Sequence, residues 1–201
     1  KKLEGTITVG GAKNAVLKII AGSILFKNTL TIQNMPFVED VKRMGELLTD
    51  LGASVEFSPG EVKINTEKIN KQDLDEKIAT AMRSSVVLTG PLLARFGKVV
   101  FPAPGGCTIG KRPIDLFIKA YEKMGATVEY KDDAYVMTAQ KLKGAEIFFD
   151  IQTVTGTETI MMAAVLAEGT TVLKNCAMEP EISSLAEYLV SCGARIQGAG
   201  T

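Results

Sequence analysis

Apolar residues recur at three- and four-residue spacing in three similar segments of the chain, and each segment predicts an amphipathic helix. The helices cover roughly residues 38–50, 113–123 and 179–191, and each ends at a glycine suited to the left-handed conformation that closes a helix. The phrases at these ends are alike: Leu51-Gly52-Ala53-Ser54-Val55, Met124-Gly125-Ala126-Thr127-Val128 and Cys192-Gly193-Ala194-Arg195-Ile196. The chain therefore contains three repeated units.

Strands are predicted around these helices. Alternating residues on either side of a turn predict β-hairpins over residues 55–64 and 127–137. The first and third units also match elsewhere, since residues 3–7 resemble residues 142–147 and residues 28–34 resemble residues 169–175. Each unit is therefore predicted to run strand, helix, strand, helix, hairpin, or βαβαββ, which is an α/β fold.

Three further helices are predicted to be buried on every side. Residues 12–25, 77–94 and 157–167 carry apolar side chains almost all round, which a helix lying on one face of a sheet does not need. We expect helices inside and sheets outside. The repeats are approximately residues 12–70, 71–140 and 141–201, after a separate strand over residues 1–11. The third unit ends at Gly198-Ala199-Gly200-Thr201, where the others continue into a hairpin, so we expect it to be truncated.

The composition is that of an ordinary globular protein. Of 201 residues, 46% are hydrophobic and 23% are charged, and 23 cationic residues balance 23 anionic ones, so nothing in the overall charge indicates nucleic acid or an acidic membrane surface as a partner. The most apolar stretch, residues 84–94, is too short to span a bilayer, and the N-terminus lacks a signal-peptide pattern. A cytoplasmic location is predicted.

Candidate chemistry centres on Cys107. It lies in a glycine-rich loop, Pro104-Gly105-Gly106-Cys107-Thr108-Ile109-Gly110-Lys111-Arg112, where two cations and the following helix start favour a nearby anion. The chain has no histidine, so a thiol, with an ordinary pKa of about 8.5, is its nearest proton carrier to neutral pH. The three cysteines show no metal-ligand spacing and no disulfide framework, and no metal or organic cofactor is implied.

Several motifs in order resemble the UDP-N-acetylglucosamine enolpyruvyl transferases over essentially the whole chain. They are Gly10-Gly11-Ala12-Lys13-Asn14-Ala15, Ala81-Met82-Arg83-Ser84-Ser85, Gly90-Pro91-Leu92-Leu93-Ala94-Arg95-Phe96-Gly97 and residues 104–116. The resemblance implies roughly the N-terminal half of a two-domain enzyme whose domains are inside-out α/β barrels. It also implies transfer of an enolpyruvyl group from phosphoenolpyruvate to UDP-N-acetylglucosamine, the opening step of peptidoglycan synthesis.

The resemblance implies a role for each catalytic candidate. Cys107 would be the proton donor and the residue alkylated by fosfomycin, Lys13 and Arg112 would contact phosphoenolpyruvate, Asn14 would touch the sugar, and Arg83 would lie in the substrate site. Each residue also has a plain structural interpretation. Cys107 is then an inert loop cysteine and Lys13 a solvated lysine. Arg83, taken as buried in an apolar helix, is then paired with a structural carboxylate.

Two segments would bind the nucleotide sugar. The first is Pro113, Ile114, Asp115 and Leu116, and its proline and aspartate also suit plain capping of the following helix. The second is Ile151, Gln152, Thr153 and Val154, where the family commonly has lysine in place of Ile151 and serine in place of Thr153. Cys176 and Cys192 are assigned to the core without a function.

Two other functions stay open. A shikimate-pathway enolpyruvyl transferase would share the fold and the chemistry, although the Gly-Gly-Cys-Thr-Ile-Gly loop speaks against it. A binding-only fragment is the second, because the family draws an aspartate and a further arginine from the C-terminal half, against which residues 1–11 would pair. The expected partners are therefore phosphoenolpyruvate, UDP-N-acetylglucosamine and that C-terminal domain, with no nucleic acid and no membrane.

Overall fold

The computed structural model describes residues 4–7, 9–103 and 114–201. Its helices, including two 3₁₀ segments (η), are α1 (Lys13–Gly22), η1 (Ser23–Leu25), α2 (Glu39–Asp50), α3 (Glu76–Ala81), η2 (Arg83–Leu88), α4 (Thr89–Phe96), α5 (Asp115–Lys123), α6 (Val154–Ala164) and α7 (Pro180–Ser191). Its strands are β1 (Leu30–Gln33), β2 (Ser54–Ser58), β3 (Glu61–Asn65), β4 (Lys98–Pro102), β5 (Thr127–Lys131), β6 (Ala134–Thr138), β7 (Glu146–Phe148) and β8 (Val172–Lys174). Together they confirm the α/β class.

The sheets follow the internal repeat. The first two units each form an antiparallel three-stranded sheet, in the orders β1-β3-β2 and β4-β6-β5. Each has a hairpin on one side and the preceding strand on the other. The third unit forms only the parallel pair β7-β8, because residues 194–201 contain no strand. The repeat and the absence of the third hairpin therefore agree with the sequence pattern.

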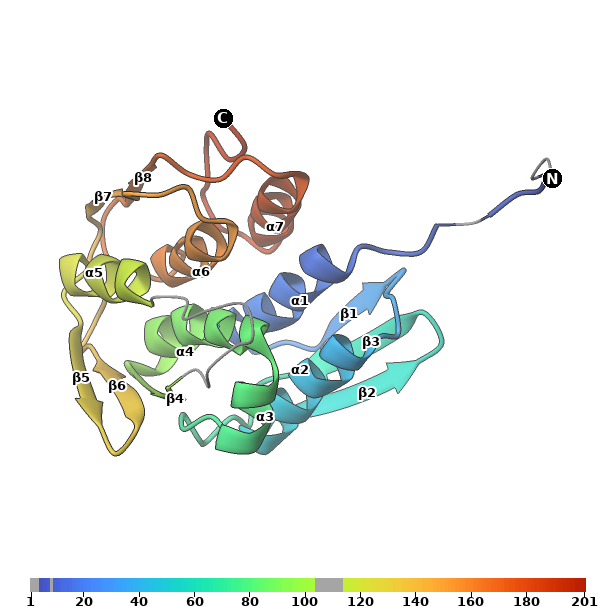
Figure 1. The fold of residues 1–201 in the computed structure, drawn as a ribbon, viewed down its shortest axis with the longest axis horizontal. Coiled ribbons are helices and arrows are strands. Elements are labelled where there is room, and N and C mark those ends of the chain that lie inside the picture. The colour runs from blue at the N-terminus through green and yellow to red at the C-terminus, as the bar shows by residue number, and fades with distance from the viewer. Residues whose placement is uncertain (1–3, 8, 104–113) are drawn as a thin grey trace.

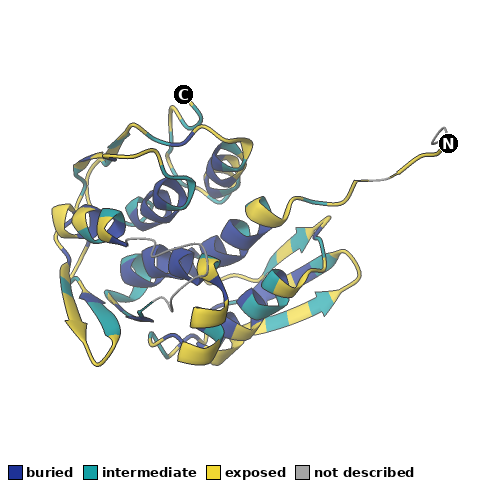
Figure 2. Cartoon of the chain, in the orientation of Figure 1, coloured by how far each residue is buried: buried dark blue, intermediate teal, exposed yellow. Residues whose placement is uncertain are grey.

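Helices fill the middle of the molecule and the sheets lie around them (Figure 1). The helices α1, α4 and α6 carry the longest runs of buried residues (Figure 2), and in α6 the run is unbroken from Gly156 to Ala163. The prediction of helices inside and sheets outside is confirmed for this part of the fold, while closure into a complete barrel stays a prediction. In the part of the chain that the structure describes, every helix is too short or too polar to cross a bilayer.

Glycines end the three amphipathic helices as predicted. Gly52, Gly125 and Gly193 have φ angles of 104°, 88° and 103°, in the left-handed region where a side chain would be strained. The backbone N–H groups of the next residues, Ala53, Ala126 and Ala194, donate back to carbonyls near the helix end. The same phrase in the sequence therefore closes all three helices in the same way.

The single helix predicted over residues 77–94 is wrong, because the structure divides it into α3, η2 and α4. Asp75 caps α3 by accepting a hydrogen bond from the N–H of Ile78 at 3.0 Å. Met82 then takes extended angles, with φ −134° and ψ 114°, and stops the helix. The apolar pattern predicted burial correctly, but it did not reveal this break.

The repeat predicts a strand between the two helices expected in the second unit, and β4 occupies that place and pairs along its length with β6. The strand predicted over residues 1–11 is not formed by residues 4–7 and 9–11, and the described residues before Gly11 extend away from the rest of the molecule (Figure 1). The predicted pairing of residues 1–11 with a second domain stays a prediction, and residues 1–3 and 8 lie outside the described residues.

The helices α4 and α6 approach each other closely at Gly90, which has no side chain. A Cβ added to Gly90 of α4 would lie 2.3 Å from the carbonyl oxygen of Thr159 in α6, well inside van der Waals contact. Since the obstacle is backbone, one helix would have to move.

We expect Gly90→Ala to destabilise the protein by about 1–3 kcal/mol through overpacking, although alanine favours helices over glycine by about 1 kcal/mol. Urea denaturation would measure the change. Gly10→Ala is the matched control, because its added Cβ meets no atom within 4 Å. A Gly90→Ala protein as stable as the wild type would show that α4 and α6 are not packed this closely.

An ion pair is buried among these helices. Lys18 Nζ of α1 lies 3.2 Å from Glu158 Oε2 of α6, and their side chains are 8% and 0% exposed. Neither Glu158 carboxylate oxygen has a hydrogen-bond partner in the described structure, so charge attraction holds the pair together. Burial is the main cause that raises the pKa of Glu158; Lys18 partly offsets it and Glu181 and Glu179 add to it, so that the pKa reaches about 7.

This raised pKa makes the stability of the protein depend on pH. Folded Glu158 holds its proton more tightly than the unfolded chain does, so its contribution is complete below about pH 4.5 and is lost as the pH rises to about 7. We expect the free energy of unfolding of the wild type, relative to Glu158→Gln, to fall by up to about 3 kcal/mol across that window. Urea denaturation over a pH series would measure it, with Glu187→Gln as an exposed control. A difference in the free energy of unfolding between the wild type and Glu158→Gln that stays constant across the pH series would contradict this prediction.

Candidate functional site

The N-terminal ends of α1, α6 and α7 gather in one place. Gln152, just before α6, donates to the carbonyl of Cys176 at 3.3 Å, and the N–H of Ala177 donates to Thr157 Oγ1 at 3.1 Å. These bonds tie the start of α6 to the segment leading into α7. The start of α7 in turn shares a pocket of about 430 Å³ with the start of α1, lined by Ala12, Lys13, Asn14, Ala15, Pro180, Glu181 and Ser184.

Such a gathering favours negatively charged ligands. The first N–H groups of a helix have no partner within the helix, and the helix dipole adds a partial positive charge at that end. The structure gives α1 and α7 no side-chain cap, whereas Thr153 caps α6 by accepting from the N–H of Gly156 at 3.1 Å. Phosphate and carboxylate groups are the ligands that such helix ends bind best.

Lys13 and Asn14 both lie at this site, exposed in the first turn of α1. Lys13 Nζ forms an ion pair with Asp40 Oδ2 of α2 at 2.8 Å, and the two side chains are 49% and 38% exposed. Lys13 thus has one surface partner, while its role toward a substrate stays a prediction. Because the pair is largely exposed, its strength is low and an anionic ligand can compete for the lysine.

The second predicted nucleotide-sugar segment, residues 151–154, leads into α6. Ile151 is 69% exposed, Gln152 and Thr153 make the bonds described above, and Val154 is the first residue of α6. Ile151 is apolar and the side chain of Gln152 is a neutral amide, so neither brings a charge to the site. The helix end is the polar feature that this segment offers to a ligand.

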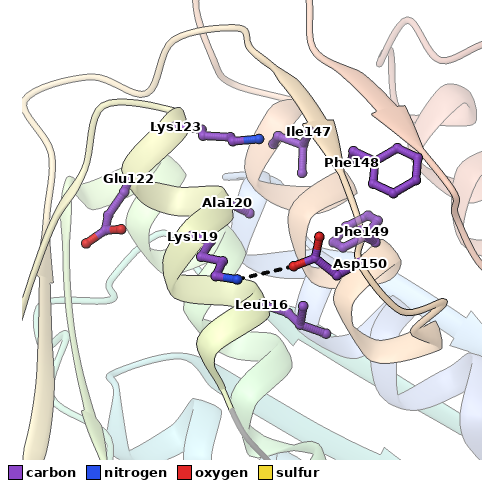
Figure 3. A pocket seen from close by; sticks show the side chains of 9 residues that line it. All are labelled: Leu116, Lys119, Ala120, Glu122, Lys123, Ile147, Phe148, Phe149 and Asp150. Carbon is purple, nitrogen blue, oxygen red and sulfur yellow. Dashed lines mark hydrogen bonds and ion pairs between the residues drawn. The ribbon is translucent and has the colours of Figure 1, made fainter.

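One residue of the first nucleotide-sugar segment lines a separate pocket, together with the residue that precedes the second segment. Ile114 is buried, Asp115 begins α5 and is exposed, and Leu116 lines a pocket of about 480 Å³ between α5 and the end of β7. Figure 3 shows this pocket, in which Lys119 Nζ lies 3.2 Å from Asp150 Oδ2. Since Asp150 directly precedes Ile151, the structure brings the two predicted segments to one region.

Arg83 does not occupy the buried position assumed for it. It is exposed and begins η2, directly after the break at Met82. The premise that it needs a buried anion is therefore wrong, and a role in the substrate site stays a prediction. The reason is local, because the end of α3 turns this residue out of the apolar face that the uninterrupted helix would have given it.

Three predicted residues, Cys107, Arg112 and Pro113, lie outside the described residues, so their roles stay predictions. The described cysteines, Cys176 and Cys192, are half-buried and unbonded to each other. Burial raises the pKa of the Cys176 thiol, the reverse of what activates a nucleophile. Within the described ranges, no group of three or more histidine, cysteine or acidic residues is arranged to hold a metal ion.

The structure adds residues that sequence reasoning missed. Asp40 pairs with Lys13 from another helix, and Glu181 and Ser184 face it across the smaller pocket. Lys119 pairs with Asp150 at the larger one. For Asp40 and Glu181 the sequence signal is a place in the first turn of an amphipathic helix, which is equally typical of plain capping.

Comparisons with known proteins agree on one family. The profile of EPSP synthase (3-phosphoshikimate 1-carboxyvinyltransferase) matches residues 1–201. Proteins named UDP-N-acetylglucosamine 1-carboxyvinyltransferase from Desulforapulum autotrophicum and Campylobacter hominis are 48% and 51% identical over 100% of this chain. In each case the chain spans about half of the relative, 48% of its length.

Solved structures share the fold at low sequence identity. The enolpyruvyl transferase NikO from Streptomyces tendae matches with a TM-score of 0.84 and 19% identity, over 97% of this chain and 46% of that one. The EPSP synthase from Acinetobacter baumannii matches with a TM-score of 0.75 and 22% identity, over 98% of this chain and 45% of that one. In both, the match covers less than half of the solved chain.

The weak Lys13–Asp40 pair predicts that the fold does not need Lys13. We expect Lys13→Met and Asp40→Asn each to change the free energy of unfolding by less than about 1 kcal/mol, as for exposed ion pairs in general. Urea denaturation of both variants and of the double variant would give the coupling energy directly. A loss of several kcal/mol in either single variant would contradict this and make Lys13 a structural residue.

Proposed function

Because the chain belongs to the EPSP synthase (3-phosphoshikimate 1-carboxyvinyltransferase) family, we propose that it is the N-terminal part of an enzyme that transfers the enolpyruvyl group of phosphoenolpyruvate to UDP-N-acetylglucosamine. One observation carries the choice of acceptor. The relatives that are about half identical along the whole chain are named for that acceptor, whereas the EPSP synthase structure shares only 22% of its residues with this chain.

The reaction is an addition followed by an elimination. A sugar hydroxyl gives up its proton to a base as it attacks the phosphate-bearing carbon of phosphoenolpyruvate, while the methylene carbon takes a proton from an acid, which gives a tetrahedral intermediate. Loss of a proton from the new methyl group and departure of phosphate then restore the double bond. A proton donor and cations that stabilise the carboxylate and phosphate are the groups that this sequence of steps requires.

The residues of this chain suit those requirements. Cys107 is the proposed proton donor, since the chain has no histidine and neighbouring cations lower the pKa of a thiol. Arg112 and Lys13 are the proposed partners of phosphoenolpyruvate. Asn14 is the proposed sugar contact, and the uncapped N-terminus of α1 supports anion binding at that position.

The remaining predicted residues are proposed to contact the nucleotide sugar. Pro113, Ile114, Asp115 and Leu116 would contact the uridine and diphosphate from the start of α5. Ile151 to Val154 would contact the sugar nucleotide from the start of α6, where the helix end, and not a side-chain charge, attracts the diphosphate. Arg83 is proposed as a further substrate contact from its exposed position.

The proposed reaction also indicates the cellular location and process in which the protein would act. Transfer to UDP-N-acetylglucosamine is the first committed step of peptidoglycan synthesis and uses cytoplasmic substrates, so the protein would act in the cytoplasm in cell-wall formation. A cysteine at position 107 would also make it a target of fosfomycin, which alkylates that thiol.

We expect activity to need a C-terminal half, because the chain spans only 48% of its relatives and an active site that closes between two domains excludes water. The measurement is phosphate release from phosphoenolpyruvate plus UDP-N-acetylglucosamine, for this chain alone and with a C-terminal half added. Release only with both halves, abolished by Cys107→Ser, is the expected result. Shikimate 3-phosphate in place of the nucleotide sugar is the matched acceptor control.

Each other outcome has a distinct meaning. Release with shikimate 3-phosphate and not with the nucleotide sugar would replace the proposed acceptor by that of EPSP synthase. Release in neither case, with the nucleotide sugar still bound, would leave a binding module. Full turnover by Cys107→Ser would remove the thiol as the proton donor.

A further inference from the structure

The buried pair Lys18–Glu158 lies one helical turn inside the candidate site. Lys18 follows Asn14 by four residues on α1, and Glu158 follows Val154 by four residues on α6. Residues at this spacing share one face of a helix and lie about 6 Å apart along its axis. The pair therefore connects the first turn of α1 to the first turn of α6.

A gain in stability does not explain why two charged residues are buried at this position. Taking two ions out of water costs about as much as their attraction returns, and apolar residues of similar size are often equally stable. The neighbours of the pair make the burial of Glu158 harder, since Glu179 and Glu181 at the start of α7 are of like charge. An apolar contact would have avoided both costs.

An ion pair differs from an apolar contact in its geometry. Apolar side chains tolerate sliding and repacking, whereas two opposite charges buried among apolar residues are held at one separation. Here the separation between Lys18 Nζ and Glu158 Oε2 is 3.2 Å. Lys18 is also the cation that offsets the carboxylate of Glu158 beneath the gathered ends of three helices.

We propose that Lys18 and Glu158 form a positioning pair, which sets the spacing between the first turns of α1 and α6 that carry the proposed substrate-binding residues. Neither residue touches substrate. They act through Asn14 and Lys13 on one helix and through Thr153 and Val154 on the other. The effect on substrate affinity rests on the proposed function, whereas the effect on the two helix ends does not.

The test uses this chain together with its proposed C-terminal half, at a pH above the pKa of Glu158 of about 7 so that the pair is charged, and compares it with the double variant Lys18→Met/Glu158→Met. We expect this variant to keep the wild-type denaturation midpoint, because methionine fills similar space. The KM for UDP-N-acetylglucosamine should rise about tenfold with a smaller change in kcat, since misplaced binding groups weaken affinity. Lys18→Arg retains the charge pair and should keep KM within about twofold of the wild type.

A second measurement does not depend on catalysis. The Val16 N–H donates to Ala12 O at 3.1 Å and the Thr157 N–H donates to Thr153 O at 3.0 Å, so these bonds close the first turns of the two helices. Hydrogen exchange at both amides should speed up about tenfold in the double variant, without a matching change elsewhere in the core. Leu47→Ala, in the buried face of α2, is the control for general destabilisation.

The outcomes separate the two proposals. Wild-type exchange and wild-type KM in the double variant would overturn the positioning role. The same KM rise in Leu47→Ala would also overturn it, because stability alone would then explain the effect. If the wild type shows no turnover while exchange at both helix ends responds as expected, the proposed function fails and the pair still sets the spacing of the two turns.

Discussion

Burial of α1, α4 and α6 on nearly every side is the constraint on which the rest of the structure depends. A helix enclosed in this way satisfies its backbone internally along its length and leaves unpaired N–H groups only at its first turn. Sheets and amphipathic helices surround the enclosed helices (Figure 1), so ligands have access to their ends and not to their sides. The candidate site is therefore a set of helix N-termini, joined through residues 150–154 to the start of α5.

The electrostatics of this site come from the backbone as much as from side chains. Helix ends supply partial positive charge. Lys13 forms a weak, exposed ion pair with Asp40, and an anionic ligand can compete with Asp40 for the lysine. Acidic residues at the start of α7 oppose that field and raise the pKa of Glu158. The helix ends and Lys13 are therefore the features that favour an anionic ligand, as both proposed substrates are, while the acidic residues of α7 weaken that preference.

Much of the fold was predictable because it depends on local pattern. Three amphipathic helices and their closing glycines followed from apolar spacing, and the hairpins followed from alternation around a turn. The break at Met82 was not predictable in this way, because η2 continues to bury apolar residues as the expected helix would have done. β4 followed from the repeat, although only the structure gave its pairing with β6. Arg83 was misplaced as a consequence of the missed break.

The sequence by itself determined the α/β class, the threefold repeat, the enclosed helices and the residue types available for chemistry, since these depend on spacing along one chain. Which residues meet depends on how distant segments pack against one another. The pairing of Lys13 with Asp40, the burial of Lys18 against Glu158 and the gathering of three helix ends each join segments far apart in the sequence. Contacts of this kind depend on how helices pack against one another, and the periodicity of a single helix carries no information about its neighbour.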